Sequence, residues 1–274
     1  MTSLDRDAIH AHLGGSTARR LVRLEAFEEI ESTNSYLMAQ EAPSPGLVRI
    51  ALTDNQVAGR GRHGRAWQSP PGSGIALSIG YTFAEQPADL AALTLAAGLG
   101  VVDALGSIGI EGVQLKWPND LIANNGKLGG ILTETRSLPG GAIMVVSGLG
   151  LNLQLDQQIV SDLASEGGRR VVDLAGFAGS LPCRNELTAR LIDGLCATFL
   201  AFEAGGFSAY VERWTGVDWL RGRSLEVDTP SASVRGTGAG VAGDGALLVL
   251  TESGDVTRIT SGTIVLAGEQ ETAE

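Results

Sequence analysis

The chain has 274 residues, a mass of 28.3 kDa and a formal net charge of −11 at pH 7. Its 43% hydrophobic and 19% charged residues are typical of an ordinary globular protein and exclude a disordered chain. The acidic excess argues against a surface that coats nucleic acid, although it is compatible with a local basic pocket.

The sequence predicts neither a targeting or membrane-spanning segment nor a disulfide or zinc site. No apolar core follows the arginines near the N-terminus, so we expect no signal peptide. The longest apolar stretch, residues 88–105, is interrupted by Asp89 and Asp103, so we expect no membrane span. Cys183 and Cys196 have no CxxC spacing. Reduced thiols in a cytoplasmic protein are therefore expected rather than a disulfide or a zinc site.

The first part of the chain predicts a mixed α+β domain over residues 23–217. A short helical pattern at residues 4–13 and a Gly-Gly break come first, and residues 1–22 are too few for an independent domain. Strands are expected at 24–30, 47–52, 75–83, 113–116, 121–123, 130–135 and 142–153, and helices at 32–38, 88–105, 185–204 and 207–214.

After Asp218 the pattern changes to short β-type runs separated by Gly/Asp turns such as Gly243-Asp244-Gly245. The runs lie at 225–227, 232–235, 246–251, 256–260 and 263–266. This pattern predicts a small β-barrel over residues 218–268, appended to the larger domain. Residues 269–274 form an acidic tail, for which we expect fraying.

A glycine- and arginine-rich loop follows the second predicted strand. It reads Gly59-Arg60-Gly61-Arg62-His63-Gly64-Arg65-Ala66-Trp67. Glycine lets a ligand approach the backbone closely, and arginine offers a charged fork for carboxylate or phosphate oxygens. In an acidic chain, this loop predicts a site for an anion. His63 has no assigned role.

Four further motifs place polar residues and glycines near strand ends. They are Ser32-Thr33-Asn34, Lys116-Trp117-Pro118-Asn119-Asp120, Lys127-Leu128-Gly129-Gly130-Ile131-Leu132 and Gly148-Leu149-Gly150-Leu151-Asn152-Leu153. Taken alone, the first is typical of a helix cap and the third of a solvated lysine at a strand end. Lys116 and Asp120 lie beside apolar runs, where an unpaired charge is costly. The fourth contains only part of a dinucleotide-binding GxGxxG, so it favours a Rossmann fold weakly.

In their order and spacing, these motifs resemble the biotin–protein ligase family over roughly residues 25–155. The resemblance implies a mixed-sheet catalytic domain like that of class II aminoacyl-tRNA synthetases and lipoate ligases, with a C-terminal SH3-like β-barrel. It also implies two half-reactions. Biotin and ATP, with Mg²⁺, give biotinyl-5′-AMP and pyrophosphate, and a lysine of a biotin carboxyl carrier domain then takes the biotinyl group and releases AMP.

The resemblance also assigns site residues. Catalytic roles fall to Lys127, which contacts the activated carboxyl oxygen and α-phosphate, to Arg62, which retains the adenylate, and to Asp120, which orients or deprotonates the carrier lysine. Biotin contacts are implied for Ser32, Thr33, Asn34, Gln56, Gly59, Arg60, Gly61, Arg62, Trp67 and Lys127. ATP contacts are implied for Arg65, Trp67, Lys116, Asn119, Asp120 and Asn152. No residue is assigned to a protein-bound metal.

Two departures from the family pattern bear on function. Gly129 stands where many members have alanine, which affects fine positioning. The Ser32 motif lies too early for the winged helix-turn-helix of repressor-type members. A monofunctional ligase that does not bind DNA is therefore expected, either as a monomer or as a homodimer. The alternatives are a lipoate–protein ligase, which the loop and the Lys116–Asp120 corner disfavour, and a sensing regulator that forms the adenylate but transfers it poorly.

Overall fold

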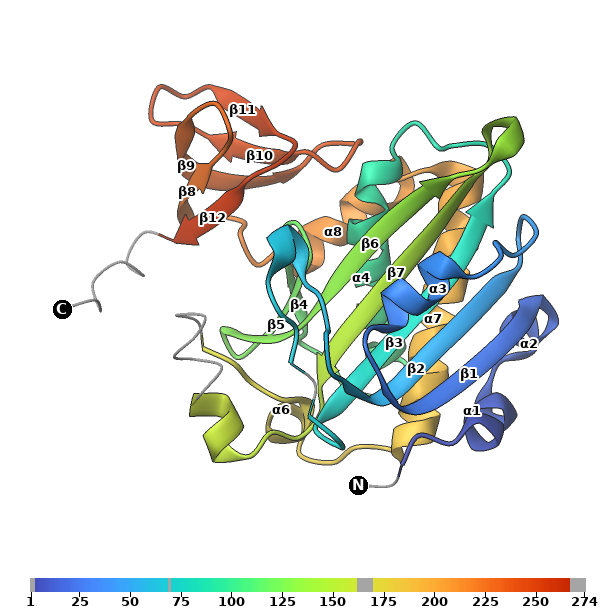
Figure 1. Cartoon of the computed structure of the whole chain (residues 1–274). Coiled ribbons are helices and arrows are strands. Elements are labelled where there is room, and N and C mark those ends of the chain that lie inside the picture. Colours follow the sequence, from blue (N-terminus) through green and yellow to red (C-terminus); the bar gives the residue numbers. More distant parts are fainter. Residues whose placement is uncertain (1–2, 69, 162–169, 267–274) are drawn as a thin grey trace.

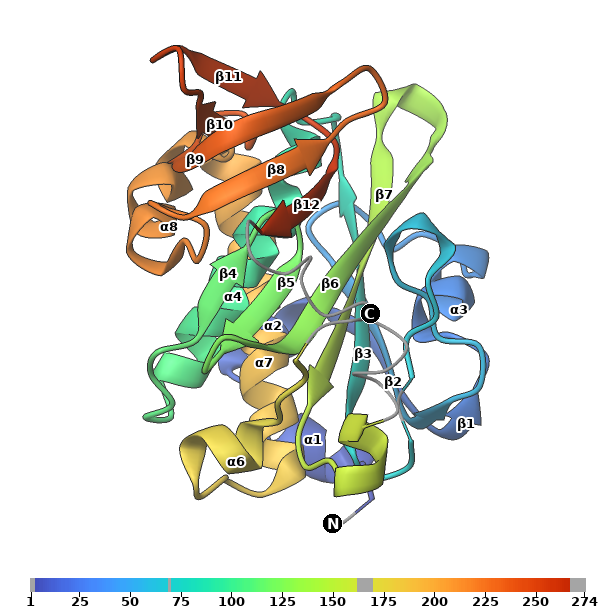
Figure 2. The ribbon, with the colours of Figure 1, turned by 90° about the vertical axis from the view of Figure 1, so that its left-hand side faces the viewer.

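The computed structural model describes residues 3–68, 70–161 and 170–266, which build two β-sheets with helices packed around the larger one (Figure 1). Within these ranges the larger sheet has seven strands in the order β1-β2-β3-β7-β6-β5-β4, and the smaller has five in the order β11-β10-β9-β8-β12. Figure 2 shows the smaller sheet beside the β4–β6 side of the larger one. This arrangement confirms the predicted α+β class.

The larger sheet is mixed. Its strands are β1 (Leu21–Ile30), β2 (Val48–Gln56), β3 (Gly74–Phe83), β4 (Gln114–Lys116), β5 (Asp120–Ala123), β6 (Gly126–Ser137) and β7 (Ile143–Asn152). β1 and β2 are parallel, and every other neighbouring pair is antiparallel. A parallel pair needs a crossover connection, which contains the short helix α3 (Thr33–Ala39).

β6 begins four residues earlier than the sequence pattern predicts. Asn124 and Asn125 both have positive φ, at 46° and 58°, and connect β5 to β6 in a tight hairpin. Asparagine adopts this conformation more readily than most residues, which suits it to such turns. The hairpin brings Lys127 into the strand rather than leaving it before the strand, and thereby fixes the direction of its side chain.

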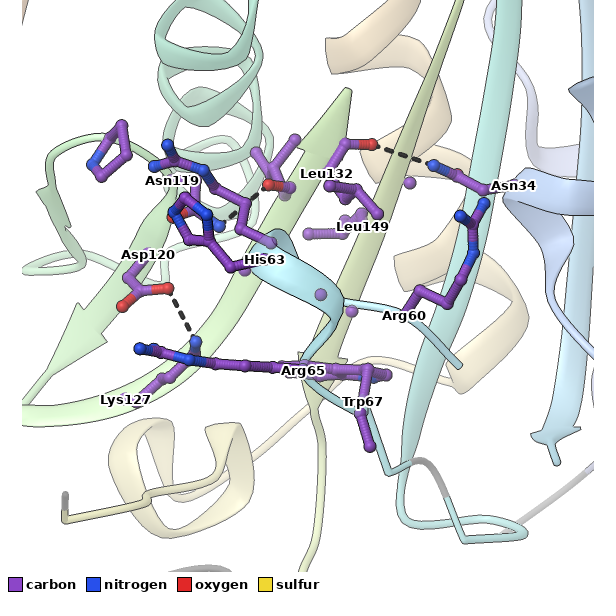
Figure 3. Close-up of a pocket in the computed structure, with 18 of the residues that line it drawn as sticks. Asn34, Arg60, His63, Arg65, Trp67, Asn119, Asp120, Lys127, Leu132 and Leu149 are labelled. Atoms are coloured by element: carbon purple, nitrogen blue, oxygen red, sulfur yellow. Dashed lines mark hydrogen bonds and ion pairs between the residues drawn. The ribbon is translucent and has the colours of Figure 1, made fainter. Parts of the chain in front are cut away.

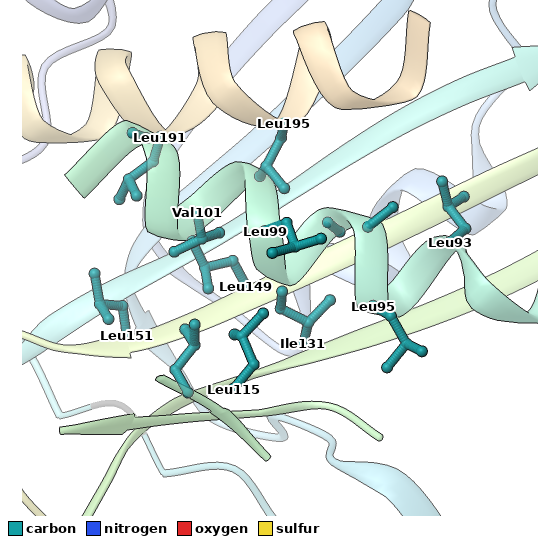
Figure 4. Close-up of a cluster of buried hydrophobic side chains, with 14 of the residues drawn as sticks. Leu93, Leu95, Leu99, Val101, Leu115, Ile131, Leu149, Leu151, Leu191 and Leu195 are labelled. Atoms are coloured by element: carbon teal, nitrogen blue, oxygen red, sulfur yellow. The ribbon is translucent and has the colours of Figure 1, made fainter. Parts of the chain in front are cut away.

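Helices cover both faces of the large sheet. On one face, α4 (Leu93–Gly106) lies between the sheet and α7 (Arg184–Gly205), as Figure 4 shows. Its side chains are therefore apolar nearly all round. The two helices approach closely where Gly100 meets Gly194, since a Cβ on Gly194 would lie 2.5 Å from the Gly100 carbonyl oxygen. On the other face, α3 packs Leu37 into a small cluster with three apolar side chains of β2 and β7.

The N-terminal segment contains one helix more than the sequence pattern predicts. α1 (Arg6–His12) ends just before the Gly-Gly pair, as expected, and α2 (Gly15–Arg20) begins at that pair. Gly14 is the N-cap of α2, and its N–H donates to the Asp193 carboxylate of α7 at 2.9 Å. This contact with α7 gives the Gly14 N–H, at the start of α2, an acceptor that no side chain nearby in the sequence provides.

The remaining elements connect the two sheets or build the smaller one. They are η1 (Arg62–Gly64), η2 (Leu90–Ala92), η3 (Pro139–Gly141), α6 (Leu174–Ala178), η4 (Ser208–Tyr210), α8 (Val211–Val217), β8 (Ser224–Asp228), β9 (Ser233–Val241), β10 (Leu247–Leu250), β11 (Val256–Ile259) and β12 (Thr263–Leu266). α6 has no counterpart among the predicted elements. No helix in the described ranges combines the length and the apolar character that a membrane span needs.

Asp218 lies at the junction between the two sheets. Its backbone bridges Leu115, and the next N–H, that of Trp219, donates to the Leu115 carbonyl oxygen at 2.9 Å. The Asp218 carboxylate accepts from the Leu220 N–H at 2.9 Å, and burial raises the pKa of this carboxyl above its usual value. The division of the chain at residue 218 remains a prediction.

We expect Asp218→Asn to raise the melting temperature at pH 7 by about 2–4 °C. Because folding raises the pKa of this carboxyl, the stability that it contributes is fully present below the usual aspartate pKa and is lost as the pH rises through the folded-state value. Asparagine keeps an acceptor for Leu220 and carries no charge that must be desolvated. The gain should shrink near pH 4 in thermal unfolding curves.

Asp228→Asn, on the exposed end of β8, is the control because its carboxylate is solvated. It should change the melting temperature by less than about 1 °C at pH 7. A lower melting temperature of Asp218→Asn than of the unmodified protein at pH 7 would contradict the argument from burial.

Candidate functional site

A cavity of about 160 Å³ lies where the arginine loop (residues 59–67) folds over the large sheet (Figure 3). Its walls come from the start of α3, the end of β2, the corner between β4 and β5, and the middle of β6 and β7. Gly262 and the first two residues of β12 in the small sheet, Thr263 and Ile264, also line it. All predicted site residues except Gly59 and Asn152 lie on its wall.

Neutral polar side chains form one part of the wall, which we call the polar floor (Ser32, Thr33, Asn34, Gln56). The first three are buried, with exposures of 3–5%. Ser32 is the N-cap of α3, as predicted, and the Gln56 Oε1 accepts from the Thr33 N–H at 2.9 Å. The helix start therefore turns backbone donors and small polar side chains toward the end of β2.

Asn34 is held on three sides. Its Nδ2 donates to the Leu132 carbonyl oxygen at 3.1 Å and to the Glu134 Oε2 at 2.9 Å, and its Oδ1 accepts from the Ser78 hydroxyl at 2.6 Å. A Cβ on Gly148 would collide with the Asn34 Oδ1. The absence of a side chain at this point of β7 is thus required for the polar floor.

The arginine loop is folded on itself. The Trp67 N–H donates to the Gly59 carbonyl oxygen at 2.9 Å, and the Gly61 N–H donates to the Arg65 carbonyl oxygen at 2.7 Å. A Cβ on Gly59 would collide with the Trp67 carbonyl oxygen. Gly59 is therefore needed for loop closure, although it does not reach the cavity wall.

Both ends of the arginine loop contact the large sheet. Arg60 pairs with Glu134 of β6 at 2.9 Å. The indole of Trp67 lies directly against Gly150 of β7, where a Cβ would collide with the ring. The Trp67 ring fills the space that the missing side chain of Gly150 leaves, so this contact needs both residues.

Cationic side chains gather on the other part of the wall. Lys127 pairs with Asp120 at 2.7 Å and lies 5.8 Å from the Trp67 ring centroid. Burial lowers the pKa of the Arg62 guanidinium, while nearby Asp120 counteracts this shift and Arg65 adds to it. An arginine stays charged even so. Three positive groups therefore face one carboxylate, which suits the binding of an anion with more than one charge.

The corner between β4 and β5 positions two more predicted residues. Lys116 is buried, with 5% exposure, and its Nζ lies 5.1 Å from the centroid of the Trp219 ring. The Asn119 Nδ2 donates to the Ile131 carbonyl oxygen at 3.1 Å, which ties the corner to β6. Asn119 is thus a structural member of the wall as well as a predicted ATP contact.

Asn152 lies behind the wall. Its Nδ2 donates to the carbonyl oxygens of Val172 at 3.0 Å and of Lys127 at 3.5 Å. The Lys127 N–H in turn donates to the Arg170 carbonyl oxygen at 2.8 Å. The structure therefore places Asn152 where it supports the backbone of Lys127, and it does not bring the side chain to the cavity.

Sequence reasoning missed several residues of the site. Ser78 and Glu134 bind the polar floor, and Gly262 and Thr263 bring the small sheet to the cavity. Glu134 gave a signal, since it is a charged residue within a strand of the large sheet. No sequence signal indicated that the small sheet lines the cavity, because this depends on how the two sheets pack.

Known proteins resemble this chain in sequence and in fold. The model of the biotin/lipoate A/B protein ligase family matches residues 26–152. The bifunctional ligase/repressor BirA of Salmonella typhimurium is 33% identical over 249 residues, which cover 90% of this chain and 73% of the relative. The biotin–[acetyl-CoA-carboxylase] ligase of Mycobacterium tuberculosis is 35% identical over 184 residues, covering 65% and 64%.

Solved structures agree. The biotin protein ligase of Aquifex aeolicus in complex with biotin and ATP superposes with a TM-score of 0.69 at 25% identity, and the match covers 91% of this chain and 99% of that one. The family match, the identity with the curated relatives and the shared fold confirm the resemblance to biotin–protein ligases. The chain belongs to the biotin/lipoate A/B protein ligase family.

Proposed function

We propose that this chain is an ATP-dependent biotin–protein ligase, which forms biotinyl-5′-AMP and transfers biotin to a lysine of a biotin carboxyl carrier domain. The observation that carries the proposal is the division of one cavity into a neutral polar floor and a cationic wall. A neutral ureido ring suits the first and a carboxylate beside phosphates suits the second. The named activities of the curated relatives support the same reaction.

In the first half-reaction, a carboxylate oxygen of biotin attacks the α-phosphorus of ATP. The new bond joins this oxygen to the phosphorus, and the bond to the bridging oxygen breaks as pyrophosphate leaves. Lys127, Arg62 and Arg65 would neutralise the charge that builds up on these oxygens. Lys116 would add a charge from the β4–β5 corner. Mg²⁺ would enter on the phosphates of ATP, as is usual for nucleotide substrates.

In the second half-reaction, the carrier lysine attacks the acyl carbon. An amide bond forms, the acyl–phosphate bond breaks and AMP leaves. The attacking nitrogen must lose a proton, and Asp120 is the carboxylate placed beside Lys127 to accept it or to orient the amine.

The first expected outcome concerns the unmodified protein. Biotin, but not lipoate, should trigger pyrophosphate release from ATP, because the polar floor offers hydrogen-bond partners that only a ureido ring can use. A biotin carboxyl carrier domain should then gain one biotinyl group, measured by intact mass. Its Lys→Arg variant is the control and should gain none. Pyrophosphate release with lipoate alone would replace the proposal with a lipoate ligase.

Lys127→Met should lower the rate of adenylate formation by about 10²–10³-fold, since it removes a charge aimed at the reacting oxygens. Methionine retains much of the length of the side chain, and pyrophosphate release measures the effect. Lys116 and Lys127 are the two lysines of the chain. Lys116→Met is thus the natural comparison, and it should raise the KM for ATP more than it lowers kcat. A Lys127→Met rate within threefold of the unmodified protein would exclude the catalytic role.

Gly150→Ala should raise the KM for ATP by about tenfold, because the new methyl group displaces the Trp67 ring and loosens the arginine loop. Steady-state kinetics with varied ATP measure it. Gly106→Ala is the matched control, since a Cβ there meets open space. If both variants have the same KM for ATP, the contact between Trp67 and β7 does not shape the site.

A further inference from the structure

A continuous chain of hydrogen bonds connects the polar floor to the arginine loop. It runs from Thr33 through Ser78 and Asn34 to Glu134 and ends at Arg60. Thr33, Ser78 and Asn34 have exposures of 3%, 0% and 5%, so solvent does not compete for these contacts. The chain of hydrogen bonds therefore runs from α3 to β3, back to α3, then to β6 and on to the loop.

Counting hydrogens gives this chain one direction. Both hydrogens of the Asn34 amide are used, one on the Leu132 carbonyl oxygen and one on Glu134. The Asn34 Oδ1 must then accept, and it takes the single hydroxyl hydrogen of Ser78. The Ser78 hydroxyl oxygen also lies 2.7 Å from the Thr33 Oγ1, and the Thr33 hydroxyl donates its own hydrogen to the Gln56 Oε1 at 3.1 Å.

This direction determines what the floor presents to a ligand. With its hydrogen directed at the Gln56 Oε1, the Thr33 hydroxyl oxygen has its lone pairs left to accept. The Gln56 Oε1 accepts from the Thr33 N–H at 2.9 Å and from the Thr33 hydroxyl at 3.1 Å. The Thr33 oxygen then matches an N–H donor of a ligand. A head group without N–H gives this acceptor no ligand partner, which is unfavourable in a buried site.

Glu134 is the fixed end of the chain. A carboxylate only accepts, so it holds the Asn34 amide in one orientation. Both of its oxygens also lie 2.9 Å from the same terminal nitrogen of Arg60. The Glu134 side chain is 25% exposed and that of Arg60 is 45% exposed. One residue thus contacts the floor on one side and the loop on the other.

We propose that Glu134 is a positioning residue that sets the polar floor to accept N–H donors and holds the arginine loop over it. The inference rests on the proposed biotin function and deepens it, because the same residue favours a ureido ring over an apolar head group. No substrate contact by Glu134 is needed. It acts through Asn34 and Arg60.

Glu134→Gln tests the proposal with almost no change in shape. The glutamine amide presents one oxygen and two hydrogens, so it cannot accept from both Asn34 and Arg60 through two oxygens. The KM for biotin should rise about tenfold, and the KM for ATP should rise by less, about threefold, because Arg65 lies in the same loop. In the ligand-free protein, trypsin should cleave the loop arginines about fivefold faster, since the loop opens more often.

Two comparison variants separate the parts of this inference. Glu226→Gln removes another glutamate–arginine pair on a β-strand, in the small sheet, where the glutamate side chain is 24% exposed. It should leave both KM values and the trypsin cleavage unchanged. Ser78→Ala breaks the chain inside the floor and leaves the Arg60–Glu134 pair in place. It should raise the KM for biotin without faster cleavage of the loop.

The outcomes distinguish this inference from the proposed function. A Glu134→Gln protein with an unchanged KM for biotin and unchanged trypsin cleavage would overturn the inference, even if biotin is the substrate. An unmodified protein that releases no pyrophosphate with biotin would overturn the proposed function. The cleavage of the ligand-free loop would then still decide whether Glu134 holds it. Thermal unfolding of each variant shows whether its fold is intact.

Discussion

The site depends on three positions of β7 that face the same way. Residues 148, 150 and 152 alternate with apolar residues and therefore lie on one face of the strand. Gly148 makes room for Asn34 and Gly150 makes room for Trp67, so the polar floor and the arginine loop rest on the same strand. Asn152 then supports the backbone of Lys127. The segment 148–152, which resembles part of a dinucleotide-binding motif in sequence, thus supports the polar floor, the arginine loop and the backbone of Lys127.

The cavity wall is positively charged, although the chain as a whole is negatively charged. A net charge of −11 disfavours the approach of ATP and biotin at long range, so binding must be local. The Debye length of about 8 Å at physiological salt confines this repulsion to short distances. Within the cavity, Arg62, Arg65 and Lys127 outnumber Asp120, and partial burial strengthens their attraction for phosphate.

Local signals predicted much of this site. Ser32 caps α3 as its position before a helical pattern indicates, and Gly59 is required where glycine suits a close turn. What could not be predicted depends on pairing between distant strands. The role of Ser78 requires β3 to lie beside α3, and that of Glu134 requires β6 to pass under the loop. The N-cap of α2 at Gly14 has its partner in Asp193, which lies 179 residues away in the sequence.

The strength of the Arg60–Glu134 contact fits a loop that must both close and open. A partly exposed ion pair contributes about 0–1 kcal/mol, far less than a buried and fully satisfied network. Such a pair biases the loop toward closure while substrates can still enter and AMP can still leave. If the pair were buried, breaking it would cost about 3–5 kcal/mol and would slow each turnover. The half-exposed position of Arg60 at the edge of the loop therefore suits a loop that opens in every turnover, whereas the contacts of Asn34 are buried.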